Sequence, residues 1–378
     1  MAWSEPHERT YVDRSFLKTR HGKIPCQTCH QGNPLASNWQ AAHEGIVRDP
    51  TFPDADKACG ACHQGITSTA KNSLHHTLAP FSRTIRARAN KKDQGIMDKV
   101  WSAKDKHCSV CHASCGQCHV SRPDYAEGGF LAGHVFQKSP PMDSGCAGCH
   151  SGRTYKEYTG GNEGYPADVH YAKVNMTCMD CHTGMEMHAD ARGVASRLDL
   201  PERPRCENCH WDAVSENPST ASHRIHRDKV ACQVCHGRPY KNCFQCHVGT
   251  DKQGLPYYQS RETTMLFKIG INPGKSEDRP YDYVVLRHAP ANPGLFDFYV
   301  KDGLSDFDRL PTWKLDTPHT LQRVTPQNKN CNNCHGNTAL FLQKEDVTDW
   351  EQRANAKVMV PATRIPSPVN NPMPCPPR

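Results

Sequence analysis

The sequence predicts a fold of short α-helices and much irregular coil, with a minor β-hairpin near residues 263–288. Three observations lead to this prediction. Cys-x-x-Cys-His occurs ten times in 378 residues, only 36% of the residues are hydrophobic, and the chain holds 29 Pro and 26 Gly. A chain of this length with so few apolar side chains would make a poor core by itself. Another source of apolar surface is therefore expected.

The repeated motif places two thiols and an imidazole within five residues. The ten motifs use twenty of the 21 cysteines and leave only Cys375. The motif cysteines are Cys26, Cys29, Cys59, Cys62, Cys108, Cys111, Cys115, Cys118, Cys146, Cys149, Cys178, Cys181, Cys206, Cys209, Cys232, Cys235, Cys243, Cys246, Cys331 and Cys334. The histidines that close the motifs are His30, His63, His112, His119, His150, His182, His210, His236, His247 and His335.

Three kinds of site use such closely spaced cysteines: a disulfide scaffold, a zinc ribbon and a covalently attached c-type haem. Disulfides have no use for the invariable histidine, and ten zinc sites with one rigid spacing would be unusual. We therefore predict ten c-type haems (haem c). Cysteines three apart on a helical turn present both sulfurs on one side for the two haem vinyl groups. The adjacent histidine would bind the iron as its proximal ligand.

Histidines outside the motifs are candidates for the second axial position of each iron. There are thirteen of them, enough for ten sites. The favoured ten are His21, His43, His75, His134, His170, His188, His223, His226, His288 and His319. His7, His76 and His107 are reserves, and methionine ligation is less favoured because histidine is in excess. His223 and His226 lie three apart, so both could face the haem pair that follows them at Cys232 and Cys243.

The formal charge of +7 does not predict a nucleic-acid partner. Each haem would bring two propionates, and the 46 Lys and Arg are expected to pair with them. No stretch approaches the roughly 18 apolar residues of a transmembrane helix, so no transmembrane segment is predicted. The first residues, MAWSEPHERTYV, do not form a signal peptide. Because c-type haem is attached outside the cytoplasm, we expect an extracytoplasmic location, either periplasmic or extracellular at the cell surface.

Motif spacing divides the chain into four regions that belong to one continuous haem array. They are 1–140 with haems one to four, 141–250 with haems five to nine, 251–336 with a haem-poor insertion and haem ten, and 337–378 with a C-terminal helix and a Pro-rich tail.

Secondary structure is expected mainly in the haem-poor insertion and near the C-terminus. TTMLFKIGINP and YDYVVLRH are rich in β-branched and aromatic residues around a turn-rich connector, which predicts the hairpin. A helix is predicted over 346–359, with Thr348 as its cap and Glu351 completing a capping box. The last residues are Pro-rich and are expected to be extended. Elsewhere short helices are expected around each motif.

The ten motifs resemble those of the multihaem c-type cytochromes used in respiratory electron transfer, and the resemblance covers residues 21–336. HCSVCHASCGQCHVSRP and HRIHRDKVACQVCH are similar to stretches of such proteins from anaerobic, metal-respiring bacteria, and the motif number points to the decahaem members. The resemblance implies a multihaem cytochrome c fold, with helices and coil wrapped around the haems. It also implies electron transfer through mostly bis-His haems, with redox proteins or extracellular acceptors such as metal oxides as partners. A homopolymeric filament is one form that it suggests.

A second class remains open, a multihaem reductase of nitrite, hydroxylamine, tetrathionate or sulfite. It would need one five-coordinate haem. Nitrite reductases of this class often carry Lys in place of a motif histidine, whereas all ten motifs here keep His. The sequence therefore favours an electron carrier over an enzyme. Cys375, the odd cysteine, is either an exposed thiol or the site of an intermolecular disulfide.

Overall fold

The computed structural model describes residues 8–111, 113–123, 126–190 and 192–370. The chain forms two compact units, each assembled from separate stretches of sequence. Unit 1 comprises Met1–Arg83, Cys108–Gly152 and Thr177–Arg203, and unit 2 comprises Thr84–His107, Arg153–Met176 and Pro204–Arg378. The first six motifs belong to unit 1 and the last four to unit 2. The four regions predicted from the motif spacing stay a prediction.

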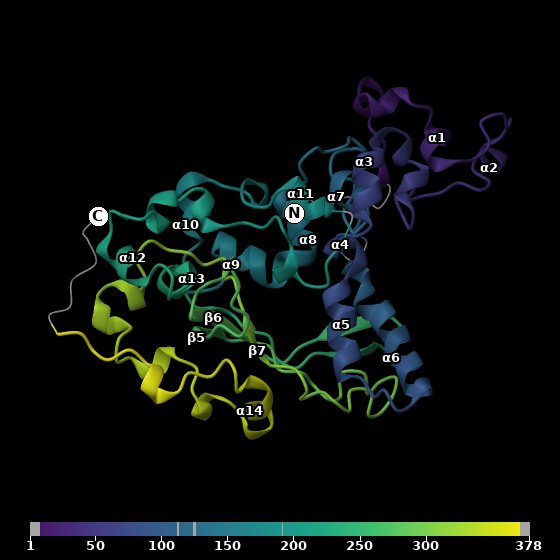
Figure 1. Cartoon of the computed structure of the whole chain (residues 1–378). Coiled ribbons are helices and arrows are strands. Elements are labelled where there is room, and N and C mark those ends of the chain that lie inside the picture. Colours follow the sequence, from purple (N-terminus) through teal and green to yellow (C-terminus); the bar gives the residue numbers. More distant parts are fainter. Residues whose placement is uncertain (1–7, 112, 124–125, 191, 371–378) are drawn as a thin grey trace. The chain divides into compact units, whose positions relative to one another are not determined.

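Unit 1 consists of short helices and coil (Figure 1). Its helices are α1 (Cys26–His30), α2 (Trp39–Ala42), α3 (Gly60–Ala70), α4 (Leu74–Thr77), α7 (Cys115–His119), α8 (Ala147–His150) and α11 (Gly184–His188), and α5 (Ala79–Arg88) begins in it. Polar side chains cap several of them: Asn38 accepts a hydrogen bond from the N–H of Ala41, and Ser73 accepts one from that of His76.

Very little apolar surface is buried in unit 1. Among its described residues, the buried hydrophobic side chains are Phe16, Val120, Ala147 and Leu200. Both hydrophobic core clusters lie in unit 2. The described part of unit 1, which carries six Cys-x-x-Cys-His motifs, therefore has almost no apolar core of its own.

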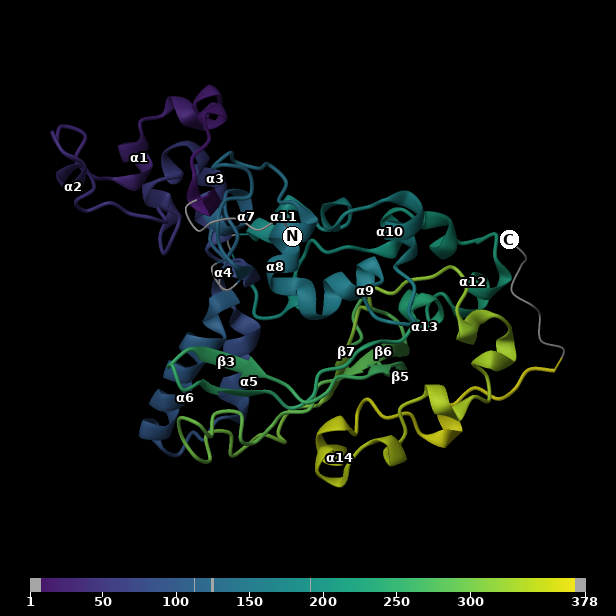
Figure 2. The same cartoon turned by 180° about the vertical axis from the view of Figure 1, so that it is seen from behind.

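Unit 2 contains the described β-strands, all of them in small antiparallel sheets. The largest sheet joins β5 (Lys268–Ile271), β6 (Tyr283–His288) and β7 (Trp313–Leu315), which lie side by side in Figures 1 and 2. The two-stranded sheets pair β1 (Tyr240–Lys241) with β4 (Met265–Leu266) and β2 (His247–Thr250) with β3 (Pro256–Gln259). The first core cluster covers the three-stranded sheet with Phe341, Leu342, Val358 and Val360.

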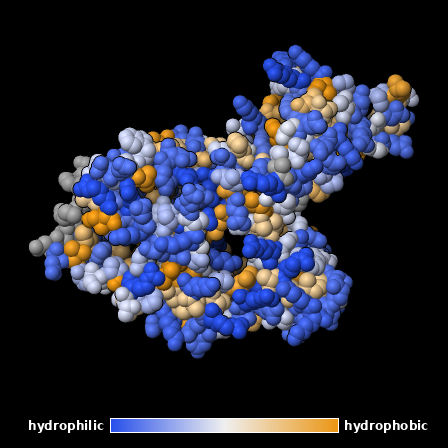
Figure 3. All heavy atoms as spheres, viewed as in Figure 1, coloured by the Kyte–Doolittle hydropathy of each residue, from blue (hydrophilic) through white to orange (hydrophobic). Residues whose placement is uncertain are grey.

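The remaining helices of unit 2 surround these sheets or form the second core cluster. They are α6 (Gln94–His107), α9 (Lys156–Thr159), α10 (Val169–Val174), α12 (Ala221–His226), α13 (Cys232–His236) and α14 (Asp349–Asn355). In the second cluster Met97 and Val100 of α6 pack with Ile85 of α5 and with Phe296. No helix among the described residues is long and apolar enough to cross a membrane. On the face drawn in Figure 3, hydrophobic residues form small patches separated by hydrophilic ones.

The predicted hairpin corresponds to β5 and β6, with Ile269 opposite Val285. The predicted helix over 346–359 is too long, because α14 covers only Asp349–Asn355. It ends where the buried Asn355 side chain accepts hydrogen bonds from the N–H groups of Thr312 and Trp313. The predicted capping box is also wrong: the Thr348 hydroxyl donates to the Glu351 carboxylate, which is itself buried.

The described part of the Pro-rich tail packs on its own chain, in unit 2. The N–H of Gly336 donates to the carbonyl of Pro366 at 2.7 Å, and His335 Nδ1 contacts the carbonyl of Ser367 at 3.1 Å. Asn332 exchanges two hydrogen bonds with the backbone of Val369. Residues 371–378, and with them Cys375, lie outside the described residues.

Gly270 of β5 should not tolerate a side chain. A Cβ there would lie 2.0 Å from Leu286 Cδ1 and 2.8 Å from the carbonyl oxygen of Val358. Gly270→Ala should therefore lower the free energy of unfolding by about 1–3 kcal/mol, measured by denaturant titration of the holo-protein. Gly274→Ala is the matched control, because a Cβ at Gly274 has nothing within 4 Å. Equal stability of the two variants would contradict this packing.

Candidate haem attachment sites

The motifs are numbered here as sites one to ten in chain order, and most of them form a single helical turn. The helices α1, α7 and α13 coincide with the motifs of sites one, four and eight. At sites two, six, seven and ten the histidine N–H donates to the carbonyl of the first cysteine, at 2.8 to 2.9 Å. This turn places both thiols and the imidazole in a fixed relation, as the spacing predicts.

The motif cysteines form no disulfides in the described structure. Among the described residues there is also no group of three or more His, Cys, Asp or Glu side chains that could hold a metal ion directly. The motifs are therefore not gathered into zinc-type clusters.

Histidine rings from distant parts of the sequence face the motif histidines. Within the described residues, at least seven pairs join a motif histidine to a histidine outside the motifs, with ring centroids 5.8 to 6.2 Å apart. The pairs are His63 with His21, His30 with His134, His150 with His75, His119 with His188, His210 with His170, His236 with His223, and His335 with His226.

The separation of these rings fits a metal between them better than direct ring stacking. Two metal–nitrogen bonds of about 2 Å, each with about 1 Å more to the ring centre, give a separation of about 6 Å. The angles between the ring planes range from 23° to 81° although the distance hardly varies. Rings in direct contact approach more closely, as His21 does with Phe136 at 4.1 Å. A nearly constant distance at variable angles is what two axial ligands of one iron require.

Hydrogen bonds at the ring nitrogen Nδ1 orient several of these imidazoles. Nδ1 of His30, His119 and His236 lies 2.6 to 3.1 Å from the backbone carbonyls of Val47, Gln137 and Gln322. Nδ1 can donate to these oxygens, which leaves Nε2 as the metal-binding nitrogen.

Carboxylates have the same role at two other histidines. Nδ1 of His170 lies 2.8 Å from Asp168, and Nδ1 of His182 lies 2.8 Å from Glu186. Sequence reasoning missed these orienting groups. Backbone carbonyls cannot be recognised in a sequence, because every residue has one. Asp168 and Glu186 could have been found, because each lies only a few residues from a histidine.

At five of the facing histidines, burial favours the protonation state that a ligand needs. Burial lowers the pKa of His21, His75, His134, His188 and His226 below its usual value. A lowered pKa favours the neutral imidazole, and only the neutral form binds a metal.

Buried arginine nitrogens provide a further test of the fit to haem. Among the described residues, the Nε atoms of Arg122, Arg238 and Arg287 are buried and have no hydrogen-bond partner within the protein. A buried N–H donor without a partner is costly, although the Arg122 guanidinium also pairs with Glu127 through Nη1 at 3.7 Å. Carboxylates such as haem propionates would satisfy these donors.

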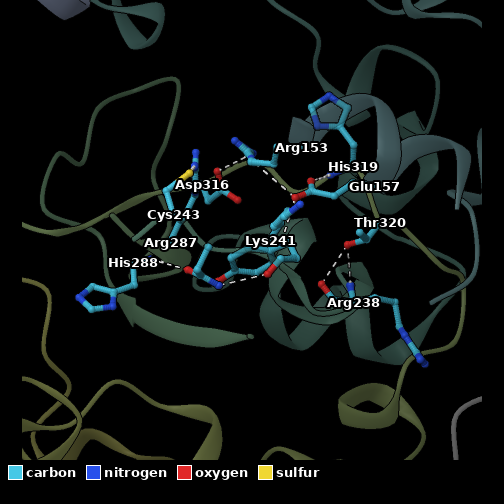
Figure 4. Close-up of polar contacts among 12 residues, drawn as sticks. Arg153, Glu157, Arg238, Lys241, Cys243, Arg287, His288, Asp316, His319 and Thr320 are labelled. Carbon is cyan, nitrogen blue, oxygen red and sulfur yellow. Dashed lines mark hydrogen bonds and ion pairs between the residues drawn. The ribbon is translucent and has the colours of Figure 1, made fainter. Parts of the chain in front are cut away.

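Site nine differs from the other sites. Residues 242–246 form no helical turn, and His247 begins strand β2. The Arg287 guanidinium contacts the Cys243 thiol (Figure 4). Asn292 Nδ2 lies 2.9 and 2.8 Å from the two ring nitrogens of His247.

His288, a predicted axial ligand, has other partners. Its Nε2 lies 2.7 Å from Glu351 Oε1, and its ring stacks on Trp313 at 4.5 Å. Burial alone would raise the pKa of Glu351, but hydrogen bonds from His288 and two threonines lower it to about 2. Glu351 is therefore a buried, charged acceptor that holds the His288 ring. In Figure 4 this ring points away from Cys243.

A buried ion network lies beside site nine. Arg153 Nη2 is 3.0 Å from Asp316, and its Nε is 3.3 Å from Glu157 (Figure 4). The Glu157 and Asp316 side chains are 0% and 3% exposed. Glu157 Oε1 also accepts the N–H of Lys241 at 3.0 Å. The network links α9 to the strand that precedes Cys243.

The other candidate histidines have varied surroundings. His43 is in the C-cap position of α2, with Nδ1 2.6 Å from the carbonyl of Trp39. His107 is buried, with Nε2 2.7 Å from the Tyr299 hydroxyl. His319 contacts Tyr158 edge-on at 6.4 Å. His7 and His112 lie outside the described residues.

One expectation for the axial histidines is corrected. His223 and His226 do not both face the motif pair that follows them. His223 faces His236 of site eight, whereas His226 faces His335 of site ten. The short helix α12 therefore presents one histidine to each of two sites.

A comparison with known families supports the c-type assignment for part of the chain. Residues 185–237 match the model of the family described as cytochrome c554 and c-prime. This stretch includes site seven and site eight, and the match supports a relation to multihaem c-type cytochromes and to haem-mediated electron transfer. No curated protein and no solved structure matches the chain.

Proposed function

We propose that the chain is an electron carrier that binds ten c-type haems through its ten Cys-x-x-Cys-His motifs. The observation that carries this proposal is the set of at least seven histidine pairs, all with ring centroids 5.8 to 6.2 Å apart in the described residues. Filled axial positions leave no place for a substrate on the iron, so paired histidines are typical of electron transfer rather than catalysis. The match to cytochrome c554 and c-prime over residues 185–237 points the same way.

The pairs also suggest which histidine serves which site. His134, His21, His188 and His75 would be the second ligands of sites one, two, four and five. His170, His223 and His226 would serve sites seven, eight and ten. Sites three, six and nine would draw on His43, His76, His107, His288 and His319, which is more than the three that they need.

The protein's own residues would hold and tune the bound groups. When bound, each haem supplies a one-electron couple between ferric and ferrous iron. The imidazoles fix the low-potential ligand type, and their Nδ1 hydrogen bonds to carbonyls and carboxylates raise ligand basicity. The buried Nε donors of Arg238 and Arg287 would pair with propionates. The thiols determine which edge of each group lies near its neighbour.

Finer features of this function rest on the family resemblance. They are an extracytoplasmic location, redox proteins or metal oxides as partners, and a polymeric form. Electron microscopy of the pure protein tests the polymer, and discrete particles under all conditions would exclude it. The tail gives this form no support, since its described part contacts its own chain.

The experiment for the main proposal counts haems and electrons. The purified holo-protein should carry ten covalent haems per chain and should take up ten electrons reversibly in a spectroelectrochemical titration. Replacing both cysteines of any one motif by serine should remove one haem and lower the electron uptake by one. A chain with fewer than ten haems, or with haem that acid and organic solvent extract, would contradict the proposal.

A second candidate function is favoured by site nine alone. His288 Nε2 is held by Glu351, and the Arg287 guanidinium lies at Cys243. An iron without a sixth ligand beside a cationic side chain would suit a small anion such as nitrite. The reduced protein would then reduce nitrite or hydroxylamine with turnover, and His247→Ala would abolish it. Absence of turnover with all four candidate substrates would exclude this function.

A further inference from the structure

We infer that site five is a three-way junction, at which the line of haem sites in unit 1 divides towards site three and towards site six. The inference rests on the proposed function, because it concerns the order in which the sites of an electron carrier lie. All residues that carry it belong to unit 1. The chain order of the motifs does not predict a junction, since it would place site five between sites four and six only.

The contacts of site five with sites four and six are made by one short element. The π-helical turn η7 (Met142–Cys146) ends at the first cysteine of site five. It packs against α7, which is the motif of site four, and against the 3-10 turn η9 (Cys178–Asp180), which begins site six. The Cys146 thiol lies beside the Cys178 thiol and near Cys118 of site four.

The contact of site five with site three is made by its second cysteine. The Cys149 thiol lies beside the Cys111 thiol of site three. A backbone hydrogen bond supports this contact independently: the N–H of Ala113 donates to the carbonyl of His75 at 3.0 Å. His75 faces His150 of site five at 6.2 Å. Site three is thus a third neighbour of site five, in addition to sites four and six.

Site one provides the contrast within the same unit. Its Cys29 lies near Cys62 of site two. Phe136 stacks on His21 of site two at 4.1 Å and contacts His134 of site one at 5.9 Å. The described thiol contacts of site one therefore lead to site two.

These contacts have a direct consequence for electron transfer. Both thioether bonds of a c-type haem are on one edge of the macrocycle, so touching sulfurs of two sites bring two such edges together. The contacts give the order one, two, four, five, with Cys59 of site two near Cys115 of site four. An electron at site five would then have two onward routes. Site three would be a side terminus at which a second redox partner could be served.

The test counts the neighbours of site five by the effect of its extra electron on their reduction potentials. His75→Met places a methionine at site five, which raises the potential of that site so that it is reduced first. The added electron then lowers the potential of each adjacent site. In a redox titration monitored by visible absorption and EPR, the reduction potentials of three other haems should be lower than in the unaltered protein. His134→Met at site one is the matched control and should lower the reduction potential of one other haem.

The outcomes separate the inference from the function on which it rests. Two or fewer shifted haems beside a high-potential site five would overturn the junction and leave the electron carrier intact. No high-potential haem in the His75→Met protein would overturn the His75–His150 ligation and the inference with it. If that variant does not assemble, His75→Ala refilled with imidazole provides the second measurement. Adding imidazole to His75→Ala should then shift the reduction potentials of site five and of three neighbouring sites. Adding it to His134→Ala should shift the potentials of site one and of one neighbouring site.

Discussion

Replacing Arg153 by methionine should lower the free energy of unfolding of the holo-protein by about 3–5 kcal/mol. Arg153 bridges the carboxylates of Glu157 and Asp316, whose side chains are almost completely buried. Without the guanidinium, two negative charges would remain together in a site that water does not reach, and desolvation would be uncompensated. Denaturant unfolding followed by far-ultraviolet circular dichroism measures the loss.

Arg309→Met is the matched control for this prediction. Arg309 pairs with Asp306 at 3.8 Å, and both side chains are about half exposed. Such a surface pair contributes about 0–1 kcal/mol, so the control should unfold close to the unaltered protein. If Arg153→Met and Arg309→Met had the same stability, the buried network would not stabilise unit 2 as described.

His226→Ala should convert one haem in ten from low-spin to high-spin in the ferric protein. His226 faces His335 of site ten, with its Nδ1 held at 2.9 Å by the carbonyl of Ser222. Removing the imidazole would open the sixth position of site ten and raise its potential. His223→Ala should open site eight in the same way, and the double variant should open two sites. EPR integration measures the high-spin fraction.

Ser222→Ala is the control on the same helix, because it keeps the backbone carbonyl that orients His226. It should leave the spin state unchanged. A fully low-spin spectrum for His226→Ala would mean that His226 is not an axial ligand. The pairing of α12 with sites eight and ten would then be incorrect.

The local turn of most sites can be predicted from the sequence, because five adjacent residues contain it. Site nine, where residues 242–246 form no helical turn, is the exception. The thiols and the proximal imidazole of a motif are held by one helical turn, as at Cys206–His210. The partner histidine is a different matter, since His134 faces His30 only through tertiary packing. His226 illustrates the limit: its spacing to site eight suggested the following motif pair, but α12 turns it towards a motif much further along the chain.

The fold shows the same division between local and long-range information. Richness in β-branched and aromatic residues predicted the strands β5 and β6. Strand β7 was not predicted, because Trp313–Leu315 is too short to form a pattern. The C-terminal helix was predicted too long for a tertiary reason. The Asn355 side chain accepts hydrogen bonds from the backbone N–H groups of Thr312 and Trp313. The helix ends there, and Val358 and Val360 are buried in the first core cluster.

The division into two units was beyond the sequence for a physical reason. Both units draw on separate stretches of chain, so the boundaries are not marked by linkers or by composition. Unit 1 also has almost no apolar core of its own. Its arrangement depends on how the six motifs lie against one another, and motif spacing alone does not encode that.

The most direct test of the central claim is a low-temperature EPR spectrum of the fully oxidised holo-protein, integrated for high-spin ferric haem. An electron carrier with paired histidines at every site should show low-spin iron only. A high-spin signal from about one haem in ten that changes on adding nitrite or hydroxylamine would contradict the account. Site nine, where Glu351 holds His288, would then be a catalytic haem supplied by the other nine.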